Sequence, residues 1–125
     1  MAKETVKTDG APAPVGPYSQ GVVAGKLLFV AGQIPKDART GQIPEDFKAQ
    51  VEQCLRNVQA IVTAAGASLA DIVKVNAYLK DLGQFKAFNE VYEKFFQAPY
   101  PARTTVGADL LGVAVEIDAI AALPR

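Results

Sequence analysis

The sequence predicts one α+β domain over residues 1–125, with two helices packed on one face of a β-sheet. Two stretches carry apolar residues at the three- and four-residue spacing of a helix, and several others are strand-like. Half of the residues (50%) are hydrophobic, which at 125 residues is enough for a core. Two helices cannot cover both faces of a sheet of about five or six strands, so we expect them on one face.

The first third of the chain is expected to form a loop, a hairpin and a second loop. Residues 9–17, DGAPAPVGP, hold three prolines and two glycines and are typical of a loop. Strand-like runs follow over 18–25 and 26–34, with Gly25-Lys26 as their turn. Residues 35–46 are expected to be a loop.

The middle of the chain predicts a long helix over residues 47–66. Gly66 supplies its C-terminal stop, and Ser68 to Asp71 form a capping-box pattern for one short turn. The apolar positions at helical spacing are Phe47, Val51, Leu55, Val58, Ile61, Val62 and Ala65.

The second half predicts strand, helix, strand and strand. Residues 72–80 alternate, with Val73, Val75, Ala77 and Leu79 on one side and Lys74, Asn76, Tyr78 and Lys80 on the other. A helix over 83–96, which Pro99 and Pro101 end, is expected to turn Phe85, Phe88, Val91, Tyr92 and Phe95 inward. Residues 103–108 and 113–123 are the closing strands.

The sheet face away from the helices is expected to mix polar and apolar side chains. It is too mixed for a monomer's core and too apolar elsewhere for plain solvent contact. A subunit interface and a partly hydrated face both fit this pattern.

Composition excludes several classes of function. The formal net charge is zero, which argues against bulk attraction to nucleic acid or anionic membrane, and no apolar run is long enough to cross a bilayer. The N-terminus has no apolar signal region, so we expect a cytoplasmic protein. Without histidine, and with Cys54 alone, the chain lacks Ser-His and Cys-His systems, the usual zinc ligand and any disulfide within the chain.

Two charged residues stand on otherwise core-like strands. Arg103 opens a strand and offers a planar fork that matches a carboxylate; Thr105 projects from the same face. Glu116 and Asp118 share the other strand's polar face, about 7 Å apart. Two plainer explanations stay open. Arg103 could be a surface or ion-paired arginine, and Glu116 and Asp118 could be the polar side of a half-exposed strand.

Two further places are candidates for ligand contact. Tyr18 stands in a glycine-proline context, where it could act as a lid or simply anchor the loop. Ala31-Gly32 end a strand, where backbone N–H groups become available to an anion. Residue patterns alone therefore predict a small-anion site without locating it.

Six blocks of the sequence resemble the RidA (YjgF) family of reactive-intermediate deaminases. The likeness runs through nearly the whole chain, and Pro-Ala-Arg followed at a distance by Val-Glu-Ile is its specific signature. The blocks are GPYSQG, FVAGQIP, the segment from Gln50 to Leu82, FNEVYEKFF, YPARTTVG and VEIDAIA.

The resemblance implies a chorismate-mutase-like α+β fold and a homotrimer whose sheets form a central barrel, with sites between subunits. It implies hydrolysis of 2-enamine/2-imino acids, such as 2-aminoacrylate in its imine form, to 2-keto acids and ammonia. It also implies that no cofactor or metal takes part.

A non-catalytic trimer that binds and senses 2-keto acids is the alternative function. The family's association with RNA cleavage is a third, against which the zero net charge argues.

By the same resemblance, Arg103 would bind the substrate carboxylate and Glu116 would act on water or protons. Tyr18 would approach from near the N-terminus, and Gly32 would offer its backbone. Asn89 would lie at the pocket edge.

The sequence departs from the family pattern at three places. Thr105 stands where many members have cysteine, so a thiol is not required here. Ala31 stands where others carry a small hydroxyl residue, so one hydrogen bond to the ligand would be missing. The segment over residues 107–112 is about two residues short for the family, which changes the pocket rim.

Overall fold

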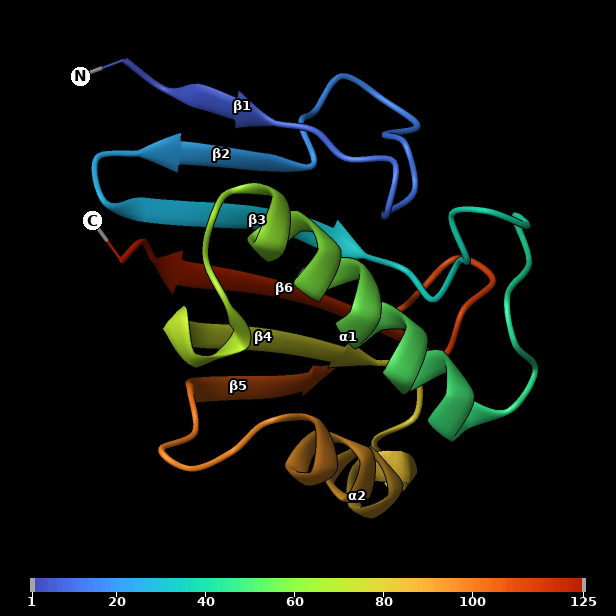
Figure 1. The fold of residues 1–125 in the computed structure, drawn as a ribbon. Helices are drawn as coiled ribbons and strands as arrows, with labels where there is room; N and C mark the ends of the chain where they lie inside the picture. The colour runs from blue at the N-terminus through green and yellow to red at the C-terminus, as the bar shows by residue number, and fades with distance from the viewer. Residues whose placement is uncertain (1, 125) are drawn as a thin grey trace.

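The computed structural model describes residues 2–124, which form six strands, two α-helices and two short 3₁₀ turns (Figure 1). No helix in this part of the chain has both the length and the apolar character to span a membrane. The strands are β1 (Glu4–Val6), β2 (Gly21–Ala24), β3 (Leu27–Gln33), β4 (Ile72–Leu79), β5 (Ala102–Gly107) and β6 (Val115–Ala122). The helices are α1 (Phe47–Ala64) and α2 (Phe85–Phe95), and the turns are Leu69–Asp71 and Leu82–Gln84.

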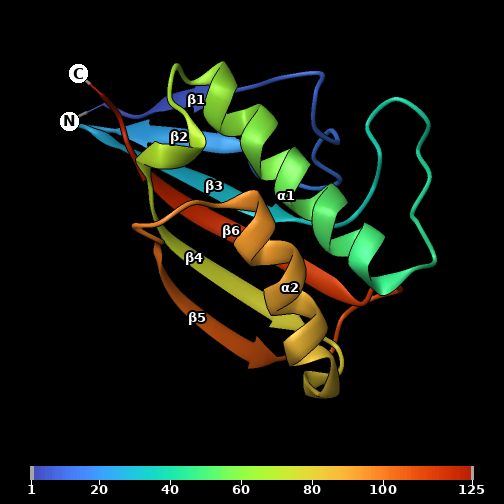
Figure 2. The ribbon, with the colours of Figure 1, turned by 60° about the horizontal axis from the view of Figure 1, so that its bottom comes forward.

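The strands form one mixed sheet in the order β1-β2-β3-β6-β4-β5. Every neighbouring pair is antiparallel except β4 and β5, which α2 connects as a parallel crossover. Helix α1 connects β3 to β4, and β6 fills the gap between these two strands. Figure 2 shows both helices over the same face of the sheet, so the predicted fold class is confirmed.

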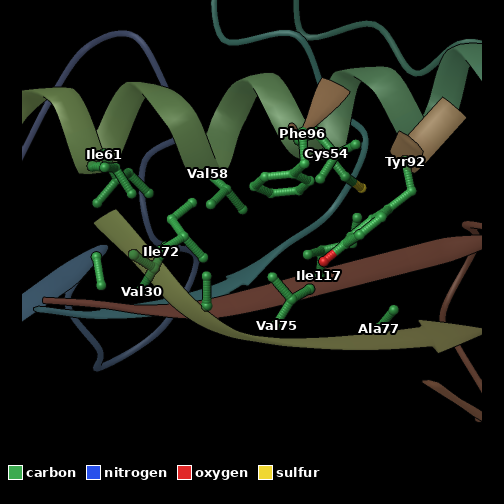
Figure 3. Packing of buried hydrophobic residues seen from close by; sticks show 14 of the residues in the cluster. Val30, Cys54, Val58, Ile61, Ile72, Val75, Ala77, Tyr92, Phe96 and Ile117 are labelled. Carbon is green, nitrogen blue, oxygen red and sulfur yellow. The ribbon is translucent and has the colours of Figure 1, made fainter. Parts of the chain in front are cut away.

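The core lies between this covered face and the helices (Figure 3). Strand β6 alternates strictly along its length, with one face buried and the other half-buried, as the sequence predicts. Phe88 and Tyr92 of helix α2 and Phe96, which caps the helix, add a row of aromatic rings, with centroids 5.6 and 4.7 Å apart in successive pairs. The main contributors are Leu28, Val30, Val51, Leu55, Val58, Ile61, Val62, Val75, Ala77, Leu79, Phe88, Tyr92, Phe96, Val115 and Ile117.

The ends of α1 are fixed by local chemistry. The Asp46 carboxylate accepts a hydrogen bond from the Ala49 N–H at 3.0 Å, which caps the first turn. Gly66 takes a φ of +86°, the left-handed conformation that ends the helix, so the predicted stop is confirmed. The capping box over Ser68 and Asp71 is also present.

Three local expectations were wrong. Strand β1 was not predicted, because three largely exposed residues at a sheet edge carry no alternation. Val73 is 47% exposed and Ile72 is buried instead, because β4 shifts register against β6 between Ile72 and Lys74. Phe85 does not point fully inward, since it lies at the start of α2 and is 43% exposed.

Within residues 2–124 no helix covers the second face of the sheet (Figure 2). We call this the open face. Leu27, Phe29 and Val106 project from it with about two fifths of their surface exposed. Asn76, Tyr78, Glu116 and Asp118 lie on it as well, since β4 and β6 pair at these positions. The open face is therefore the mixed surface that the sequence predicted.

Candidate active site

Arg103 lies on β5 beside the buried Val75 of β4 and therefore faces α2. Three aromatic rings of α2 surround its guanidinium carbon, with centroids 5.6 Å away at Phe85, 5.1 Å at Phe88 and 4.7 Å at Tyr92. Electron-rich ring faces attract a cation, and they hold the planar fork without neutralising its charge. We call Arg103 and these rings the arginine box.

One further contact orients the fork. The Asn89 side-chain oxygen accepts a hydrogen bond from Arg103 Nη2 at 2.8 Å. No carboxylate within residues 2–124 forms an ion pair with Arg103, because the ion pairs join Lys48 to Glu90 and Arg56 to Glu52. The guanidinium thus keeps an uncompensated charge and unused N–H groups, which suits it to bind an anion.

The arginine box opens to an exposed hollow of about 490 Å³. Its lining residues are Asn89, Tyr92, Glu93, Tyr100, Pro101 and Arg103. Two buried hydroxyls near Arg103, those of Tyr92 and Thr105, have no hydrogen-bond partner among the described residues. Burial raises the pKa of the Tyr92 hydroxyl, and the Arg103 charge opposes that rise, so Tyr92 is neutral at ordinary pH.

Glu116 lies on the open face, at the other side of the sheet from Arg103. It pairs across the ladder with Tyr78, and no hydrogen bond from residues 2–124 reaches its carboxylate. A register shift between Val30 and Gln33 brings Gly32 beside it. A Cβ atom at Gly32 would fall well inside van der Waals distance of Glu116 Oε2, so the glycine makes room for the carboxylate.

Gly32→Ala is therefore expected to displace the Glu116 carboxylate. The end of a flexible side chain can move, so we expect a melting temperature within a few degrees of the parent's. Any turnover that depends on Glu116 should fall by about tenfold or more. Gly83→Ala is the matched control, because its new Cβ would also crowd a carboxylate, that of Asp81, away from this site. Equal turnover in the two variants would contradict a role for the Glu116 carboxylate in the site.

Asp118, two residues along β6, is occupied by its neighbours. Tyr78 Oη donates to one carboxylate oxygen at 2.8 Å and Asn76 Nδ2 donates to the other at 2.9 Å. The hydrogen bond to Asp118 raises the pKa of Tyr78 to about 12. Of the two carboxylates on this strand, Glu116 is the one left free for chemistry.

This hydrogen bond predicts how stability depends on alkaline pH. The folded protein holds the Tyr78 proton to about pH 12, whereas an unfolded tyrosine releases it near pH 10. The stabilisation is fully present below about pH 10 and is lost as the pH rises toward 12. Denaturant unfolding should show the stability gap between the parent and Tyr78→Phe closing over that range. A stability difference that stays constant between about pH 10 and 12 would contradict the stabilising hydrogen bond from Tyr78 to Asp118.

The remaining predicted site residues lie in two places. Thr105 shares the helix-covered face with Arg103, because it pairs with the buried Ala77. Tyr18 is half exposed in the loop between β1 and β2, where its hydroxyl accepts from the Val15 N–H at 3.3 Å. Ala31 lies next to Gly32, and its N–H donates to the carbonyl of Gln20 at 2.9 Å.

One chain therefore holds three separate groups of predicted residues. Arg103, Asn89 and Thr105 lie on the helix-covered side of the sheet, whereas Glu116, Gly32 and Ala31 lie at the open face. Tyr18 belongs to the third place, the N-terminal loop. Within one chain the sheet separates the side chains of Arg103 and Glu116.

Two features of the site were missed by sequence reasoning. The arginine box was not foreseen, although Phe85, Phe88 and Tyr92 stand at the spacing of one helix face. The buried Gln20, which follows Tyr18 by two residues, was not singled out. Within residues 2–124 no three histidine, cysteine or acidic side chains gather as a metal site would require.

Comparisons with known proteins agree on one family. The family model described as Endoribonuclease L-PSP matches residues 8–123. A RutC family protein of Pyrococcus horikoshii is 50% identical over 95% of this chain and 97% of its own. The 2-iminobutanoate/2-iminopropanoate deaminase of Salmonella typhimurium is 47% identical over 94% of this chain and 96% of its own.

A solved structure extends the comparison to three dimensions. The crystal structure of Escherichia coli TdcF with bound serine superposes with a TM-score of 0.92 at 45% identity. The match covers 95% of this chain and 98% of that one.

Proposed function

The chain belongs to the Endoribonuclease L-PSP family, which is the RidA (YjgF) family of the sequence resemblance, and we propose that it hydrolyses 2-imino acids to 2-keto acids and ammonia. The observation that carries the proposal is the uncompensated Arg103, held by aromatic rings beside an open hollow. The deaminase of Salmonella typhimurium suggests 2-iminobutanoate and 2-iminopropanoate as substrates.

Arg103 would bind the substrate carboxylate through the N–H groups that Asn89 leaves free. A guanidinium and a carboxylate form two parallel hydrogen bonds, each worth roughly 1.5–3 kcal/mol when water is excluded. The rings of α2 fix the plane of the fork and therefore the direction in which the imine carbon projects. The bound serine of TdcF, which also carries a carboxylate, supports a ligand of this size.

Glu116 would manage the protons of the reaction. Water adds to the C=N carbon while Glu116 takes a proton from it, and the π electrons pass to nitrogen, to which Glu116 returns that proton. Glu116 would then carry the hydroxyl proton of this intermediate to its amino nitrogen. The C–N bond breaks as the C=O bond forms, and neutral ammonia leaves. General acid-base catalysis of this kind contributes roughly 10²–10⁴-fold. Neither step calls for a metal or cofactor. Tyr18 would close the pocket, and Gly32 and Ala31 would line it.

The site would have to be shared between subunits of a homotrimer. The sheet separates Arg103 from Glu116 within one chain, so the two can meet only if different copies supply them. The open face, with its exposed Leu27, Phe29 and Val106, supports burial against another copy.

Light scattering tests the assembly. We expect a mass of about 40 kDa at micromolar concentration, which is three copies of the 13.2 kDa chain. Burial of the open face should also make the melting temperature rise with protein concentration. A stable species at the mass of one chain would rule out a shared site.

Two other activities are separated by direct assays. A non-catalytic 2-keto-acid sensor would bind 2-oxobutanoate but would not speed ammonia release from a freshly generated 2-imino acid, whereas a deaminase does both. The family description also names an endoribonuclease, so the same preparation should be incubated with RNA. If the protein does not speed ammonia release, the deaminase proposal is rejected. RNA cleavage that Arg103→Lys abolishes would then identify an endoribonuclease instead.

A further inference from the structure

Gln20 is a buried glutamine, 3% exposed, at the point where the N-terminal loop enters β2. Its side-chain oxygen accepts from the Thr8 N–H at 2.7 Å. Its side-chain nitrogen lies 3.1 Å from the Thr8 carbonyl, 3.1 Å from that of Ala11 and 2.9 Å from that of Pro12. One side chain thus satisfies several main-chain groups at the start of the loop.

The loop has few other ties of its own. Prolines at 12, 14 and 17 lack N–H groups, so this segment cannot form a regular hydrogen-bond ladder. Between residues 7 and 20 the only main-chain hydrogen bond that closes on the loop itself joins Tyr18 N to Gly16 O. The side chain of Gln20 is therefore the main internal brace of the segment that carries Tyr18.

The main chain of Gln20 reaches the other group of site residues. Its carbonyl accepts from the Ala31 N–H at 2.9 Å. Ala31 precedes Gly32, whose missing side chain leaves room for the Glu116 carboxylate. Gln20 is thus bonded on one side to the Tyr18 loop and on the other to the strand that borders Glu116.

We propose that Gln20 is a positioning residue, which fixes Tyr18 relative to the Gly32–Glu116 corner of the site. It touches no substrate and acts through Tyr18 alone. The inference rests on the proposed function for its kinetic consequence, but its structural part, the bracing of the loop, stands without any activity.

The first test is amide hydrogen exchange on Gln20→Glu. The glutamate keeps the acceptor for the Thr8 N–H and loses both donors to the carbonyl oxygens, which it also repels. We expect faster exchange at Val15 and Tyr18 and unchanged exchange in α1 and β6. Gln50→Glu is the matched control, because this buried glutamine likewise accepts from a main-chain N–H, that of Ala114, and donates to a carbonyl, that of Pro44. Uniform loss of protection, or equal effects of both variants on the Tyr18 loop, would overturn the proposal.

The second test is a double-mutant cycle with Tyr18→Ala. If Gln20 acts through Tyr18, Gln20→Glu lowers kcat/KM by about tenfold in the parent and by less than about twofold in Tyr18→Ala. A merely structural role predicts the same fold-change in both backgrounds, and that result would overturn the positioning role. Gln20→Met, which keeps the side-chain length, repeats the cycle if the glutamate variant does not fold.

Failure of the proposed function is recognised separately. If the parent releases no ammonia from 2-imino acids, the cycle is measured on 2-oxobutanoate binding with the same criterion. Loop exchange that Gln20→Glu leaves unchanged refutes the brace whether or not the parent is active. An inactive parent with a loosened loop refutes only the deaminase assignment.

Discussion

Arg103→Lys is expected to lower kcat/KM for imine hydrolysis by about a hundredfold while the protein stays folded. Lysine keeps the positive charge but loses the planar fork, and with it the two parallel bonds to the substrate carboxylate. It also loses the hydrogen bond to Asn89 and the defined packing of a flat group among the rings of Phe85, Phe88 and Tyr92. The substrate would bind in a range of poses, so orientation is lost although attraction remains.

Steady-state kinetics and thermal unfolding on the same preparation measure this effect. Arg103 is only partly buried, so a folded variant is expected, with a modest loss of melting temperature. Arg56→Lys is the matched control, because Arg56 is an exposed arginine that pairs with Glu52 on α1 and lies outside the arginine box. Parental kcat/KM in Arg103→Lys would show that the fork does not orient the substrate.

Glu116→Gln is expected to lower turnover by roughly 10²–10⁴-fold and to leave 2-oxobutanoate binding nearly unchanged. The amide has the size of the carboxylate and fits the same space beside Gly32, but it cannot take a proton from water or pass one to nitrogen. Binding of 2-oxobutanoate involves no proton transfer, so its affinity measures ligand binding without the chemical step.

Calorimetric titration of 2-oxobutanoate beside the kinetic assay separates the two quantities. Asp118→Asn is the informative comparison, since Asp118 lies two residues away on the same strand and is held by Tyr78 and Asn76. We expect it to change stability and leave turnover close to the parent's. Loss of ligand binding in Glu116→Gln, or equal loss of turnover in both variants, would contradict the proposed role.

The elements that the sequence predicts well are those whose pattern is local and strong. Helix α1 carries an apolar stripe, a capping aspartate and a terminal glycine, and strand β6 alternates without interruption. Strand β1 and the register shift before Lys74 could not be predicted, because both depend on which strand lies alongside. A shift of this kind exposed Val73 although its own sequence pattern is regular.

The site divides in the same way. That Arg103 and Thr105 share a face, as do Glu116 and Asp118, follows from the two-residue period of a strand. That these two pairs face opposite sides of the sheet depends on the order β6-β4-β5 and on the parallel register of β4 with β5. Strand order and register cannot be predicted from local sequence. The arginine box and the hydrogen bonds of Gln20 are therefore apparent only in the folded chain.

Mixing two inactive variants tests the shared site most directly. Arg103→Lys and Glu116→Gln chains, co-expressed in equal amounts, should assemble into trimers in which some interfaces join an intact Arg103 to an intact Glu116. Random assembly gives about a quarter of the interfaces this composition, so we predict ammonia release at about a quarter of the parental rate, although each variant alone is nearly inactive. Activity of the mixture no higher than that of the two separate variants would contradict a site built from two subunits.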